Sequence, residues 1–338
     1  MAPATPPAPR WLPGGHAQTI WAAVASWRFE GPAPGWRRER WDTPDGDFID
    51  ADWLADGDAL PATAPLLVLF HGLEGSSASH YAQAFAHWAR AMQWRLVVPH
   101  FRGCSGEINR APRAYHSGDH EEIGWMLACA RAATPAATHR AAVGVSLGGN
   151  ALLRWAEEAG DTATRCAGAV AAICSPIDLA ASGQAMGRGF NRWVYTRMFL
   201  RTMKPRALAK LAQHPGLFDR ERLLAARTLH DFDNVFTAPL HGFRNTEDYW
   251  TRASAKPQLH RIRVPALLVN ARNDPFVPAA SLPAPGSLAE PVTLWQPAHG
   301  GHVGFPSGRF PGHVLGLPEA VMGWALPHLG TQAEAGHG

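Results

Sequence analysis

The residues Ala141-Ala-Val-Gly-Val-Ser-Leu-Gly-Gly-Asn150 decide the fold of this 338-residue chain. An apolar run leads into Gly144-Val-Ser-Leu-Gly148, and residues with helical spacing follow at once, which predicts a strand, a sharp turn and a helix. Such a turn is typical of a nucleophile elbow and would expose Ser146 at its tip. We expect the backbone to pass so close to itself here that a Cβ at Gly144 or Gly148 would clash. A five-residue pattern is weak evidence alone, so its partners must lie elsewhere in the chain.

Continuous apolar runs on both sides of this turn predict strands that are buried on both faces of a sheet. Residues with helical spacing lie between several of them, for example from Tyr81 to Met92. A hairpin is expected around Thr43-Pro-Asp-Gly46, and Asp119-His-Glu-Glu122 resembles a capping box that opens a helix. Strands alternating with helices predict an α/β fold with a mostly parallel sheet and helices on both faces. The predicted strands are Leu66–Phe70, Arg95–Pro99, Ala167–Cys174, Val264–Asn270 and Pro291–Gln296.

The alternation stops between about Ser175 and Lys256, where the sequence is typical of helices and loops. We therefore predict a core made of residues 1–175 and 257–338, with residues 176–256 inserted as a helical cap over one sheet edge. Residues 1–10 and 330–338 are expected to be disordered, because they lack an apolar pattern that could pack.

The composition restricts the class of protein. A net charge of +3 is too small to indicate binding to nucleic acid. The four cysteines show no C-x-x-C spacing, and no secretory signal or membrane-spanning run is recognisable. We therefore expect reduced thiols in a soluble, cytoplasmic protein. No histidine or cysteine cluster has ligand spacing, so no metal and no organic cofactor is expected.

A serine hydroxyl needs a base within hydrogen-bond reach and a carboxylate that orients the base. In chain order after Ser146, Asp274 follows one predicted strand, and His299 and His302 follow the next. Asp178, which follows the strand before, is an alternative acid. His302 is the preferred base because Gly300-Gly301 would let its ring reach Ser146, with His299 as the alternative. These positions share the carboxyl edge of a parallel sheet, where ligands bind.

The charge that develops on a tetrahedral intermediate requires backbone N–H donors that are already in place. One donor is expected from Leu147, which follows the nucleophile at the start of its helix. The second is expected from Leu73, in the loop His71-Gly-Leu-Glu-Gly75 after the Leu66–Phe70 strand.

Seven stretches together resemble one family, the YheT-like alpha/beta hydrolases, also called the AB hydrolase type 4 family. The resemblance implies an alpha/beta-hydrolase fold and a serine hydrolase of carboxylic esters, with Ser146, Asp274 and His302 at the triad positions. Relatives include esterases, lipases and acyltransferases. The stretches are Gly14-Gly-His-Ala-Gln-Thr-Ile-Trp21, His71-Gly-Leu-Glu-Gly-Ser76, Phe101-Arg-Gly-Cys-Ser-Gly106, Gly144-Val-Ser-Leu-Gly-Gly-Asn150, Asp231-Phe-Asp-Asn-Val-Phe-Thr-Ala-Pro-Leu-His-Gly-Phe243, Asn273-Asp-Pro275 and His299-Gly-Gly-His-Val-Gly-Phe305.

The sequence thus predicts a serine carboxylesterase for a small ester or lipid, acting through an acyl-enzyme. An acyltransferase with the same triad and a non-catalytic binding protein on this fold are the alternatives. For the Asp231–Phe243 segment we expect a hinge or packing role, with a second acid or a ligand contact as the alternative. The Arg188–Lys210 stretch carries seven basic and no acidic residues among aromatic ones, so it either forms a solvated lid helix or contacts an anionic membrane.

Overall fold

A central sheet organises the computed structural model, which describes residues 8–288 and 290–330. Within these residues eight strands lie in the order β1-β2-β4-β3-β5-β6-β7-β8. Every strand predicted from an apolar run is present, with its ends shifted by two residues at most. The strands are β1 (Trp36–Asp42), β2 (Phe48–Leu54), β3 (Leu66–Phe70), β4 (Arg95–Pro99), β5 (Arg140–Val145), β6 (Ala169–Ile173), β7 (Ala266–Val269) and β8 (Val292–Trp295).

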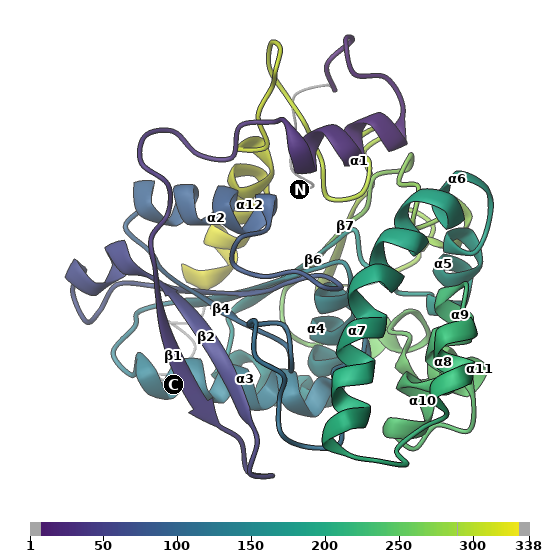
Figure 1. The fold of residues 1–338 in the computed structure, drawn as a ribbon. Coiled ribbons are helices and arrows are strands. Elements are labelled where there is room, and N and C mark those ends of the chain that lie inside the picture. The colour runs from purple at the N-terminus through teal and green to yellow at the C-terminus, as the bar shows by residue number, and fades with distance from the viewer. Residues whose placement is uncertain (1–7, 289, 331–338) are drawn as a thin grey trace.

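The sheet is mostly parallel, as the sequence predicts. From β4 to β8 all neighbours run in the same direction, and only β2 is antiparallel to its neighbours β1 and β4. The predicted hairpin is therefore the β1–β2 pair, which Figure 1 shows at one edge of the sheet. Because β3 and β5 are neighbours, the loop after β3 and the elbow after β5 emerge side by side.

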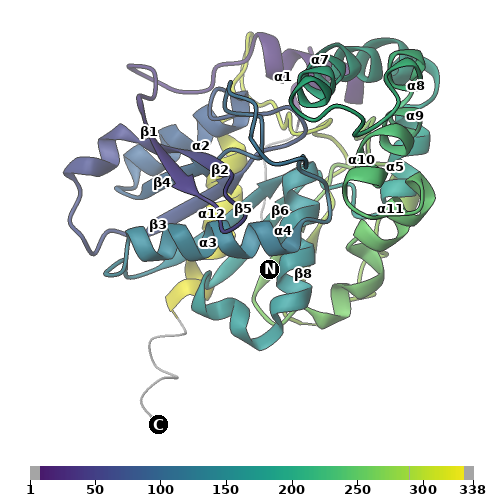
Figure 2. The same cartoon turned by 60° about the horizontal axis from the view of Figure 1, so that its bottom comes forward.

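Helices cover both faces of the sheet, as Figure 2 shows. Alternate residues of β3 belong to two separate cores, Leu66 and Val68 to one and Leu67 and Leu69 to the other. The first core is closed by α3 (His120–Ala133) and α4 (Leu147–Ala159). The second is closed by α2 (His80–Ala91) and α12 (Gly316–Gly330). Each strand is thus buried on both sides, which explains its uninterrupted apolar sequence.

Between β6 and β7 the chain is helical, and Figure 1 shows these helices gathered beside the carboxyl edge of the sheet. We propose that this stretch, predicted as residues 176–256, forms a cap. The helices are α5 (Leu179–Met186), α6 (Gly189–Asn191), α7 (Arg197–Gln213), α8 (Arg220–Ala225), α9 (Leu229–Val235), α10 (Thr237–Leu240) and α11 (Thr246–Ala253), with a π-helical turn over Arg192–Thr196 and a 3-10 helix over Lys256–Arg261.

One local prediction is wrong. The Asp119 side chain does not cap α3, because the guanidinium of Arg113 pairs with its carboxylate at 2.5 Å. Of the two ends predicted to be disordered, residues 1–7 and 331–338 lie outside the described residues, and Gly330 closes α12. No helix in the described part of the chain is both long and apolar enough to cross a membrane.

Candidate active site

Ser146 lies at the tip of a strained turn between β5 and α4. Its φ of 53° lies in the left-handed region, which a serine rarely adopts. A Cβ on Gly144 would lie 2.5 Å from the carbonyl oxygen of Gly148, and one on Gly148 would collide with the carbonyl oxygen of His71. The clash expected from the sequence at both glycines is therefore confirmed.

The structure brings Ser146, His302 and Asp274 into one hydrogen-bonded line from the ends of three strands. The Oγ of Ser146 lies 3.0 Å from Nε2 of His302, and Nδ1 of His302 lies 2.9 Å from Oδ2 of Asp274. The Asp274 carboxylate is buried and also accepts from the backbone N–H groups of Phe276 and Val277. The Phe276 ring stacks on His302 with 4.1 Å between ring centroids. The imidazole is thus held between a fixed carboxylate and the serine hydroxyl.

The two alternative residues lie in other environments. Asp178 caps α5 by accepting from the N–H of Ala181, and its other oxygen lies 3.3 Å from Nζ of Lys256. His299 is exposed, with its Nδ1 3.4 Å from the side-chain amide of Asn273. Neither residue has a hydrogen bond to Ser146 within the described residues.

The N–H groups of Leu73 and Leu147 have no hydrogen-bond partner within residues 8–288 and 290–330. Both residues line the same cavity as Ser146 and His302. Leu147 is the first residue of α4, so the positive end of the helix dipole adds to its donor strength. The structure thus places the two N–H groups expected from the sequence at one cavity, and their role as oxyanion donors stays a prediction.

A set of buried side chains holds the loop that carries Leu73. His71 donates from Nδ1 to the carbonyl of Gly72, and its Nε2 accepts from the N–H of Phe101. Burial lowers the pKa of His71 to about 3, so the ring stays neutral as this pattern requires. The hydroxyl of Tyr81 accepts from the N–H of Gly72 at 2.9 Å. The sequence indicated the loop but not these supports.

Helix α1 (Gly15–Val24) holds the loops that carry Asp274 and His302. The sequence did not indicate these contacts. The Thr19 hydroxyl accepts from the N–H of His302 at 2.8 Å. Oε1 of the buried Gln18 accepts from the N–H of Gly300 and from the side-chain amide of Asn273, both at 2.9 Å. These contacts join residues more than 250 positions apart in the chain.

Ser146 and His302 open into a cavity of about 120 Å³. The cavity lies between the sheet edge and α5, α7, α9 and α11. Its remaining lining is mostly apolar: Leu179, Met186, Phe199, Met203, Leu229, Trp250, Phe276 and Val277. A second cavity shares Leu73 and Leu147 with the first, and its mostly apolar lining also includes polar and charged side chains such as Glu74, Tyr115 and Arg206.

Asp233, from the Asp231–Phe243 segment, lines both cavities. It accepts from the Thr237 hydroxyl at 2.7 Å and from Nε1 of Trp250 at 2.9 Å. Burial raises the pKa of this carboxyl to about 6. The structure thus places a titratable group on the cavity wall, in a segment for which the sequence left both a packing role and a ligand contact open.

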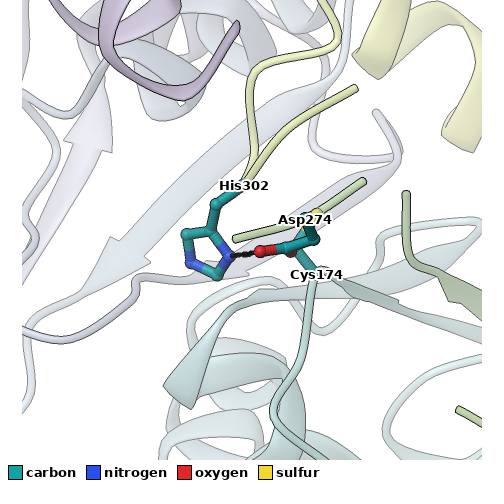
Figure 3. A group of neighbouring side chains, drawn as sticks. All are labelled: Cys174, Asp274 and His302. Atoms are coloured by element: carbon teal, nitrogen blue, oxygen red, sulfur yellow. Dashed lines mark hydrogen bonds and ion pairs between the residues drawn. The ribbon is translucent and has the colours of Figure 1, made fainter. Parts of the chain in front are cut away.

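Cys174 lies behind the acid–base pair, as Figure 3 shows. Its sulfur and the ligand atoms of Asp274 and His302 lie within 4.8 Å of one another, a spacing that could hold a metal ion. Burial raises the pKa of the thiol well above its usual value, and the carboxylate already accepts from His302 and two backbone N–H groups. A protonated thiol is a poor metal ligand, so the chemistry of this group does not favour a metal site.

Comparison with known proteins gives concordant matches. The family model for the alpha/beta hydrolase fold matches residues 65–308. YheT of Escherichia coli K12, described as a candidate esterase, is 40% identical over 299 residues, which are 88% of this chain and 86% of that protein. Phospholipase ABHD3 of Mus musculus is 30% identical over 289 residues, which are 83% of this chain and 69% of that protein.

Among solved structures, the esterase Pf2001 of Pyrococcus furiosus superposes with a TM-score of 0.52. It is 14% identical in sequence, and the match covers 88% of this chain and 93% of that one. A likeness at this identity concerns the fold alone.

Proposed function

This chain belongs to the alpha/beta hydrolase fold family, and on that premise we propose that it is a serine hydrolase of carboxylic esters with short to medium acyl chains. The proposal rests mainly on one observation. A serine–histidine–aspartate line and the backbone N–H groups of Leu73 and Leu147 all meet at one apolar cavity. The names of the relatives, an esterase and a phospholipase, support an ester or lipid substrate.

In the proposed reaction Ser146 attacks the ester carbonyl while Nε2 of His302 removes the hydroxyl proton. Asp274 keeps Nδ1 protonated, so that Nε2 is free to accept, and it stabilises the imidazolium that forms. The N–H groups of Leu73 and Leu147 hold the oxyanion. His302 then delivers its proton to the leaving alcohol. Water next attacks the acyl-enzyme, with His302 again as the base, and the acid is released.

The two cavities support a division of the substrate between them. We assign the acyl chain to the apolar cavity, because its walls are leucine, methionine and aromatic side chains. The alcohol half fits the second cavity, whose walls add charged side chains such as Glu74 and Arg206 to apolar ones. Leu73 and Leu147 belong to both cavities, so an ester carbonyl at their N–H groups would lie where the two meet.

Hydrolysis of p-nitrophenyl esters with acyl chains from two to sixteen carbons tests this function. We expect kcat/KM to rise with chain length and then to fall once the chain exceeds the apolar cavity. Ser146→Ala should lose at least about 10⁴-fold in kcat, since a serine–histidine pair acts as a unit. Turnover of every ester at the rate of Ser146→Ala would contradict the proposal.

A further inference from the structure

The outer side of the cap exposes a group of large apolar side chains that we name the cap surface. Trp193 is 69% exposed, Met198 51% and Phe190 49%, and Val194 and Leu224 are also exposed. They come from α6, the π-helical turn, α7 and α8, which lie together in Figure 1. Soluble proteins rarely leave several large side chains open in one place without a partner.

The cap surface is also strongly basic. Six cationic side chains belong to it, and none has an ion pair within residues 8–288 and 290–330. The guanidinium of Arg192 lies 5.8 Å from the Trp193 ring centroid. By contrast, Arg206 of α7 faces inward and pairs with Glu74 at 3.0 Å. The six outward cations are Arg188, Arg192, Arg197, Arg201, Lys204 and Arg227.

Basic and apolar side chains alternate around a groove on this side. Its volume is about 560 Å³, and its apolar part includes Trp193, Leu200, Leu208 and Leu224. Five of the six cations line it. Arg and Lys side chains lie along apolar surface with their charged ends outward, and tryptophan favours the boundary between lipid and water. This arrangement suits a surface that is apolar inside and negatively charged at its boundary.

We propose that the cap surface docks on an anionic phospholipid bilayer. Near such a membrane each cation is attracted by the negative surface potential, while Trp193, Met198 and Phe190 enter the interface. A second copy of this chain is a poorer occupant, because its own six cations would face the first six across the contact.

The inner sides of the same segments contact the candidate active site. The Tyr195 ring lies 4.6 Å from that of Phe276, which stacks on His302. Asn191 donates to the carbonyl of Pro275, next to Asp274, at 2.6 Å. Phe199 and Met203 of α7 line the apolar cavity. Docking would therefore bring the lipid surface against the wall of the cavity. This link to substrate entry rests on the proposed function, whereas docking itself does not.

Co-sedimentation with vesicles tests the proposal, using Ser146→Ala so that no turnover intervenes. We expect this protein to bind vesicles of phosphatidylcholine with 30% phosphatidylglycerol and to bind pure phosphatidylcholine much more weakly. At roughly fivefold per cation, Arg197→Gln with Arg201→Gln should weaken binding about 25-fold. Trp193→Ser with Met198→Ser should weaken it as well, because apolar area is lost.

Arg131→Gln with Met92→Ser is the matched control, since both residues are exposed and lie outside the cap. It should bind as tightly as the parent. The proposal is overturned by absence of binding to anionic vesicles, by equal binding to neutral ones, or by cap variants that bind like the control. A protein that binds vesicles but hydrolyses no ester with Ser146 restored would contradict the proposed function and leave docking supported.

Discussion

Replacing Thr19 by valine should slow hydrolysis, although Thr19 lies on α1 and far from Ser146 in the sequence. Its hydroxyl donates to the carbonyl of Gly15 and accepts from the N–H of His302, both at 2.8 Å. Valine has nearly the same shape but no acceptor. The N–H of His302 would then lose its partner at a site where Thr19 is only 8% exposed.

The expected loss in kcat follows from the one hydrogen bond that the N–H of His302 loses. Leaving a buried donor unpaired costs about 1–3 kcal/mol. If the loop shifts to relieve this cost, the productive position of His302 becomes less populated by the same free energy. The expected loss in kcat is therefore roughly 5- to 150-fold. KM should change little, because Thr19 does not line the cavity.

The measurement is kcat and KM for a short soluble ester, together with the melting temperature. Thr19→Ser is the matched control, since it keeps the hydroxyl and loses only a methyl group. A purely structural role would lower the melting temperature and leave kcat of the folded enzyme intact. Equal kcat for Thr19→Val and Thr19→Ser would refute the reasoning.

Three other results are expected. His302→Ala should abolish ester hydrolysis while His299→Ala keeps most of it, and kinetics showing the reverse would move the base to His299. As pH rises from 5 to 8, Asp233→Asn should become about 1 kcal/mol more stable relative to the parent. The raised pKa of Asp233 stabilises the parent only while the carboxyl is protonated, so this stabilisation is lost as pH rises through 6. A pH-independent difference in urea unfolding would contradict this. Replacing one of four buried histidines by glutamine should gain up to roughly 1.4 kcal/mol of stability over the parent per pH unit as pH drops below 6.5, since protons bind the unfolded state of the parent first, and a pH-independent difference in urea unfolding would contradict this. The last effect comes from four histidines whose pKa values burial lowers to about 3 or 4: His71, His80, His116 and His241.

Strands and the elbow could be predicted because their information is local. Leu66–Phe70 is apolar throughout since both of its faces are covered, and the structure gives β3 the same bounds. The turn at Ser146 needs small residues at positions 144 and 148, so it can be recognised from the five residues Gly144–Gly148. The edge shared by parallel strands then suggested which acid and base could meet the serine.

Contacts between distant segments could not be predicted in this way. Nothing near Thr19 indicates that its hydroxyl accepts from His302, because the pairing depends on how α1 lies against the loop after β8. Asp119 shows the same limit. Its sequence context favours a helix cap, but its carboxylate forms an ion pair with Arg113 instead. The role of the Asp231–Phe243 segment could not be predicted for a related reason, since the burial of Asp233 depends on how the helices between β6 and β7 pack.

Active-site labelling tests the central claim most directly. The protein would be treated with a fluorophosphonate, digested and analysed by mass spectrometry to locate the adduct. We predict one adduct, on the peptide that contains Ser146, and none in Ser146→Ala that has the same melting temperature as the parent. A folded parent protein that remains unlabelled, or that carries the adduct on another residue, would contradict the assignment of Ser146 as the nucleophile.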